Sequence, residues 1–144
     1  MSSTLVSNGS GGVWIHNAVG EVWLAALDTQ IRALPSPAPE LQMLSREIEG
    51  ALAAGWVEGA LQYDFAALLQ SEVASVEFKI LQSEVEASIK ARADAAPVIT
   101  QGRHQATAEF AVPEVEMLSR LFFDKGSVPT PPHVYLRDRG WTLA

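Results

Sequence analysis

The fold of this chain is decided by residues 73–93, VASVEFKILQSEVEASIKARA. Apolar residues recur there mostly at every second position, as in Val76, Phe78 and Ile80, whereas earlier in the chain they recur every three or four positions. A strand places every second residue on one face, and a helix places residues three and four apart on one face. The pattern therefore predicts a helical region followed by a small antiparallel sheet.

The two strands predicted from this stretch are Val73–Leu81 and Glu84–Ala93. A mostly α fold with one long helix over residues 60–95 is the alternative, because residues 60–96 contain neither Gly nor Pro. Such a helix would carry two apolar faces on nearly opposite sides, one with Leu69, Val73, Val76 and Ile80 and the other with Phe78, Leu81, Val85 and Ile89. A helix of this kind needs burial on both sides, whereas each strand needs only one buried face. We therefore favour the strands.

The first half of the chain predicts a helical hairpin. Apolar residues at helical spacing mark a first helix over Ala18–Leu34 and a second over Glu40–Ala54. Pro35 ends the first helix, and the short proline-rich connector makes the two helices antiparallel neighbours. Apolar residues at the same spacing predict a third helix over Trp56–Glu72.

The second half predicts a further strand and a further helix. Alternating apolar residues mark a strand over His104–Val112, after a loop over residues 94–103. Pro113 suits a first helical turn and predicts a helix over Pro113–Lys125. A last short strand is expected within His133–Leu143.

Together these elements predict an α+β fold in which the helical hairpin and third helix pack on a small antiparallel sheet. One domain is expected over residues 13–144. The Gly- and Ser-rich segment 1–12 is expected to be a flexible tail.

Composition narrows the class of protein. The 144 residues include no cysteine, and 48% of them are hydrophobic, which suits a packed core without disulfides. No stretch approaches the roughly 20 apolar residues of a membrane helix, and the first residues lack the pattern of a secretory signal. We expect a soluble, cytoplasmic protein that does not associate with membranes.

The net charge of −7 is concentrated in residues 36–95. Phosphate backbones are bound by clustered Lys and Arg side chains, and this chain has no such cluster. We therefore expect no direct binding of nucleic acid. An acidic surface instead favours a protein partner with a basic surface.

No catalytic, metal or cofactor motif is present. His16, His104 and His133 are far apart in sequence and lack the ligand spacing of zinc sites. There is neither a nucleophile elbow nor a glycine-rich phosphate loop. We predict no catalytic residue, no metal and no cofactor; if the protein were an enzyme, His104 with Glu109 or Asp64 would be the acid–base pair to test.

Two groups of residues are candidates for an interaction surface. Tyr, Trp and Arg dominate protein interfaces because each buries a large area and keeps a polar group, and the C-terminal segment combines Tyr135, Arg137, Arg139 and Trp141. The acidic candidates on the predicted strands are Glu77, Glu84 and Glu86.

We therefore predict a non-enzymatic protein-binding module, of the adaptor, inhibitor or immunity-protein type. A homodimer through a sheet edge or a helix face is a further expectation. The alternative is a small enzyme or small-molecule sensor with a pocket between the helices and the sheet.

Overall fold

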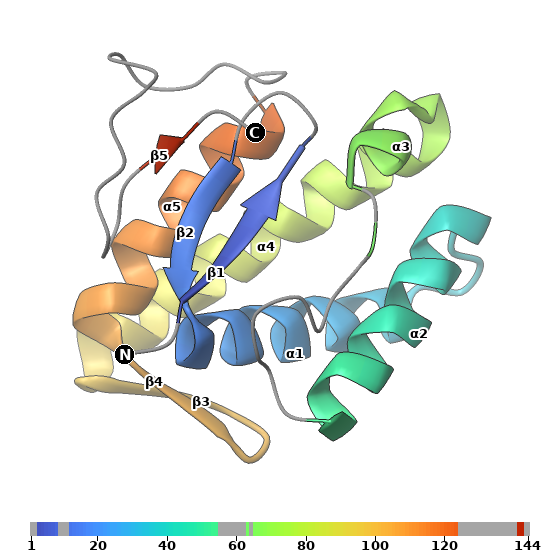
Figure 1. Ribbon diagram of the computed structural model, residues 1–144. Coiled ribbons are helices and arrows are strands. Elements are labelled where there is room, and N and C mark those ends of the chain that lie inside the picture. The colour runs from blue at the N-terminus through green and yellow to red at the C-terminus, as the bar shows by residue number, and fades with distance from the viewer. Residues whose placement is uncertain (1–2, 9–11, 55–62, 64, 124–140, 143–144) are drawn as a thin grey trace.

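The computed structural model describes residues 3–8, 12–54, 63, 65–123 and 141–142. Within these residues the chain forms five helices and five strands, and Figure 1 shows the long helices crossing behind a small sheet. The α+β class predicted from the sequence is confirmed. The placement of the strands is not, and the differences are given below.

The main sheet is built at the N-terminus. Strand β1 (Ser3–Ser7) pairs antiparallel with β2 (Gly12–His16), and β2 pairs antiparallel with β5 (Trp141–Thr142). The segment 1–12, expected to be a flexible tail, thus contains a strand, in which Thr4 and Val6 are buried and Leu5 between them is exposed. The division of the chain into a tail and one domain stays a prediction.

The helical hairpin is confirmed. Helix α1 (Asn17–Ala33) and helix α2 (Pro39–Ala54) pack against each other, and the connector between them contains two prolines, Pro35 and Pro37, which cannot continue a helix. The Asn17 side chain accepts a hydrogen bond from the Thr4 hydroxyl (2.7 Å), which ties the start of α1 to β1. Of the third predicted helix, Phe65–Gln70 is helix α3, and residues 55–62 lie outside the described part.

The two strands predicted over Val73–Leu81 and Glu84–Ala93 are wrong. Residues Glu72–Ala95 form one helix, α4, of 24 residues. Its buried large apolar side chains, Phe78, Leu81, Val85 and Ile89, follow one helical face. The apparent alternation arises because a second apolar face interleaves with the first, as the alternative fold anticipated. The antiparallel sheet predicted from these two strands and His104–Val112 therefore does not form.

The second sheet is a hairpin that the sequence placed only in part. Strand β3 (Val98–Gln101) occupies the predicted loop and pairs antiparallel with β4 (His104–Thr107), and Gly102 adopts a left-handed φ of 60° in the turn. The strand predicted over His104–Val112 thus ends at Thr107. The last helix, α5 (Ala108–Phe123), starts five residues before Pro113, which lies inside it.

The early start of α5 has a packing reason. Buried Ala111 and the Phe110 ring, which stacks on His16 with 4.3 Å between ring centroids, both lie before Pro113. A proline at this position removes one hydrogen bond, to the carbonyl of Glu109 four residues earlier, and its ring crowds that carbonyl. Packing of the added turn against β2 outweighs that loss.

The centre of the core is an aromatic cluster contributed by four helices. Trp23 of α1 packs near Phe65 of α3 and Phe122 of α5, with ring centroids 6.1 and 6.0 Å away, and Phe78 of α4 meets Phe122 edge-on at 4.9 Å. The Trp23–Phe65 pair is tilted, the Trp23–Phe122 pair is stacked and the Phe78–Phe122 pair is edge-on; offset and edge-on rings are favoured over an exact face-to-face sandwich. Among the described residues, no helix is both long enough and apolar enough to cross a membrane.

Substitutions of two isoleucines of α4 test which face of this helix is buried in the core. Ile89 is fully buried and Ile80 is 55% exposed. We expect Ile89→Ala to lower the free energy of unfolding by about 2–5 kcal/mol, because it leaves a cavity, and Ile80→Ala to change it by less than about 0.5 kcal/mol. Urea denaturation of both variants measures this. A strand over Val73–Leu81 would bury Ile80 with Val76 and Phe78, so a similarly large loss for Ile80→Ala would contradict the observed helix.

Candidate functional site

The three acidic candidates lie on α4 in three different settings. The Glu77 carboxylate accepts a hydrogen bond from the backbone N–H of Ala38 (3.0 Å) and so holds the connector between α1 and α2. Glu84 is exposed and has no partner among the described residues. Glu86 is half-buried and faces α5. The acidic surface expected from composition is therefore divided, and only Glu84 is available to a partner as it stands.

Glu86 belongs to a polar network between α4 and α5. It pairs with Lys90 (2.8 Å), which also pairs with Glu116 of α5 (2.7 Å). Burial alone would raise the pKa of the Glu86 carboxyl, but hydrogen bonds from Lys90 and Ser119 together with the Lys90 charge lower it overall. The hydrogen bonds to Glu116 and Glu86 raise the pKa of the Lys90 ammonium. These groups fasten α4 to α5, and the shifted pKa values keep Glu86 ionised and Lys90 protonated at neutral pH.

The aromatic and arginine candidates of the C-terminal segment are largely untested. Tyr135, Arg137 and Arg139 lie outside the described residues. Trp141 is placed by its backbone, which pairs with Val13 in the β2–β5 ladder. These four residues therefore stay a prediction and carry none of the argument below.

The outer face of α4 carries a surface that sequence reasoning missed. Val73, Val76 and Ile80 are 68%, 58% and 55% exposed, and they make up half of the exposed large apolar residues in the described chain. Their spacing of three and four places them on one helical face, which continues through exposed Ala87 and Ala91. We call these five residues the α4 strip. The signal was present in the sequence as the second apolar face of a long helix.

A buried acid–base pair joins β2 to α5. The Glu114 carboxylate accepts hydrogen bonds from the backbone N–H of His16 (2.8 Å) and from its Nδ1 (2.5 Å), and both residues are buried. His16 Nε2 has no hydrogen-bond partner among the described residues. Because both of these hydrogen bonds are buried, they fix the position of α5 relative to the end of β2. We assign this pair a structural role.

His104, the histidine considered for acid–base chemistry, lies beside a different carboxylate from those expected. Its Nδ1 is 3.8 Å from Glu21 Oε1 on α1. Glu109 is exposed, and Asp64 lies outside the described residues. Within the described ranges, no three His, Asp or Glu side chains gather closely enough to hold a metal ion.

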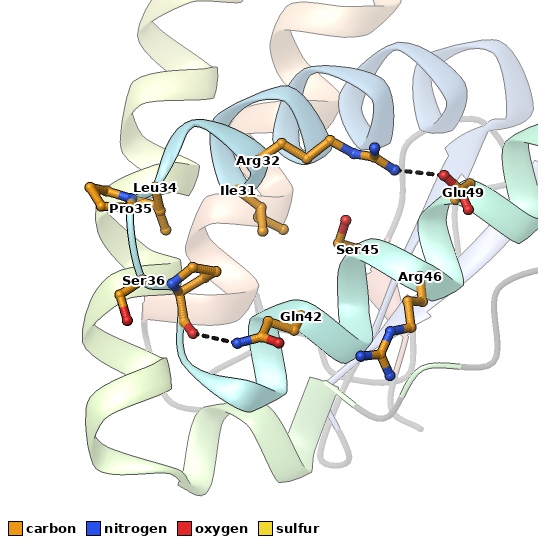
Figure 2. Close-up of a pocket in the computed structure, with 10 residues that line it drawn as sticks. Ile31, Arg32, Leu34, Pro35, Ser36, Gln42, Ser45, Arg46 and Glu49 are labelled. Carbon is orange, nitrogen blue, oxygen red and sulfur yellow. Dashed lines mark hydrogen bonds and ion pairs between the residues drawn. The ribbon is translucent and has the colours of Figure 1, made fainter.

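A cavity of about 610 Å³ lies on the helical hairpin and is open to solvent. Figure 2 shows it between the end of α1, the proline connector and α2, with Arg32 bridging toward Glu49. Hydrogen bonds to Glu49 and Asp28 raise the pKa of the Arg32 guanidinium, so its charge is matched by two carboxylates. Among the described residues that line the cavity, Arg46 is the other cation, so these residues carry little net charge to select a ligand.

Compared with known proteins, the chain matches no family model, no curated protein and no solved structure. The assignment of function below therefore rests on the geometry of this molecule.

The buried pair yields a stability prediction. We expect Glu114→Ala to lower the free energy of unfolding by about 3–5 kcal/mol, because it leaves His16 N–H and Nδ1 buried without an acceptor. Glu114→Gln keeps one acceptor oxygen and should cost less. The control is Glu49→Ala, which removes an exposed ion pair and should change stability by less than about 0.5 kcal/mol. Equal values for Glu114→Ala and Glu49→Ala in urea denaturation would contradict a structural role for the pair.

Proposed function

We propose that this protein is a non-enzymatic binding module that docks a partner protein on the α4 strip. The observation that carries the proposal is the exposure of Val73, Val76 and Ile80 on one face of a helix whose opposite face is fully packed. Folded monomers rarely leave contiguous apolar residues in water unless the patch is an interaction site.

Two polar pairs of the fold have structural roles, which supports a binding role rather than catalysis at those pairs. His16 is paired with Glu114 inside the core, and Glu86 is paired with Lys90 at a helix–helix contact. Each pair holds two elements together, and neither presents a proton donor or nucleophile to a substrate. Docking on an apolar strip requires no such group, because burial of apolar area supplies the driving force.

The partner is proposed to present a basic surface. Glu72 and Glu84 are exposed beside the strip, and the chain carries a net charge of −7. Complementary charges around an apolar contact steer the encounter and reject partners of the wrong sign. A cytoplasmic location is part of the proposal, and the cysteine-free composition suits it.

The proposal is tested with two charge-matched variants. Ile80→Glu places a carboxylate in the strip, and Met43→Glu makes the same change at a residue of α2 that is equally exposed (56% against 55%). Wild type and both variants are used as baits in host lysate, and any enriched protein is identified and its affinity measured with purified components. We expect Ile80→Glu to weaken that affinity at least about tenfold, because it buries a charge in the contact, and Met43→Glu to leave it unchanged.

Circular dichroism and thermal denaturation should show that both variants fold like the wild type. A purified partner that binds Ile80→Glu as tightly as the wild type would exclude the strip as the docking site. Equal loss of binding in Met43→Glu would show that added negative charge, rather than the strip, is responsible.

A further inference from the structure

The shape of the α4 strip indicates what kind of segment it can receive. The strip runs along one unbroken helix, with larger side chains at Val73, Val76 and Ile80 and only methyl groups at Ala87 and Ala91. Ridges of side chains on one helix pack into the grooves of another, and small residues let the two backbones approach closely. A second helix lying along α4 therefore fits this surface.

The charges beside the α4 strip indicate which charge the side chains of that second helix should carry. Glu77 and Glu84 lie along one margin, and Glu72 and Lys79 along the other, which leaves an excess of carboxylates. Lys90, one turn beyond, is held by Glu86 and Glu116 and does not balance them. A docking helix with Lys or Arg beside its apolar residues complements this arrangement, and one with Glu or Asp does not.

A second copy of this chain fits the strip less well. A twofold axis that pairs two copies of α4 antiparallel places each margin against the same margin of the other copy, so Glu77 and Glu84 would face their own counterparts. Each copy also carries a charge of −7.

We propose that the α4 strip receives a basic amphipathic helix from a partner protein. The apolar face of that helix packs on Val73, Val76 and Ile80, and its basic residues lie beside Glu84 and Glu72. This inference rests on the proposed function and adds the chemistry of the docking segment to it. Recognition of an amphipathic helix by an apolar surface is a common mode of peptide binding.

Synthetic helical peptides of about 20 residues test the inference directly. Three share one leucine stripe and differ only in flanking Lys, Gln or Glu, and a fourth has the composition of the Lys peptide in an order without helical periodicity. Binding to the full-length protein is followed by fluorescence anisotropy. We expect the Lys peptide to bind most tightly, the Gln peptide more weakly, and the Glu and scrambled peptides not at all. Salt at about 0.5 M should weaken the Lys complex, because it screens the flanking charges.

The protein variants locate the peptide. Ile80→Glu should reduce the affinity for the Lys peptide at least about tenfold, and Met43→Glu, with the same change of net charge, should leave it unchanged. Equal loss in both variants, or equal binding of the scrambled peptide, would mean that the acidic protein simply attracts cations, and it would overturn the inference.

The remaining outcomes separate this inference from the proposed function. Equal binding of the Gln and Lys peptides, both lost in Ile80→Glu, would overturn the basic helix while leaving docking on the strip intact. Binding to vesicles that contain anionic phosphatidylserine, or a dimer in light scattering that Ile80→Glu dissociates, would replace the partner helix with a membrane or a second copy. A purified natural partner that binds Ile80→Glu as tightly as the wild type would overturn the proposed function itself.

Discussion

The structure depends on the fact that α4 can bury only one of its two apolar faces. The inner face places Phe78 against Phe65 and Phe122, and its remaining large residues against α1 and α5. The opposite face, with Val73 and Ile80, remains exposed to solvent. Burial of a large apolar side chain contributes about 1.5–3 kcal/mol. The face with Phe78 has more apolar area to bury than the face with Val73 and Val76. The exposed strip is thus a consequence of how the core is filled.

Polar contacts reinforce this choice of face. Gln82 is fully buried in the middle of the inner face, where its carbonyl accepts from Trp23 Nε1 (2.7 Å) and its amide donates to Ser119 Oγ (3.1 Å). A rotation of α4 that buried the strip would leave Gln82 and the Trp23 N–H without partners, at a cost of about 1–3 kcal/mol for each buried group. A buried amide therefore sets the rotation of α4 relative to α1 and α5.

How much of this fold the sequence could predict depends on whether a segment carries one pattern or two. The hairpin of α1 and α2 was predicted because Pro35 interrupts a single helical stripe. Residues 73–93 misled because two helical faces interleave into an apparent alternation; the decisive signal was that Gln82 and Ser83 offer no residue suited to a tight turn. Strand β1 was missed because its pairing with β2 is a tertiary contact, and the Thr4–Asn17 bond that anchors it leaves no periodic trace.

The candidate site shows the same division between composition and geometry. The sequence grouped Glu77, Glu84 and Glu86 as one acidic surface, yet Glu77 holds Ala38 and Glu86 holds Lys90. Composition cannot show which carboxylates already form hydrogen bonds or ion pairs within the protein. Because few carboxylates remain free beside the strip, their charges would contribute little of the affinity of the proposed complex, since exposed ion pairs contribute only about 0–1 kcal/mol each. In the proposed complex, the free energy of docking would come mainly from the apolar residues, whose exposure follows from the packing of α4.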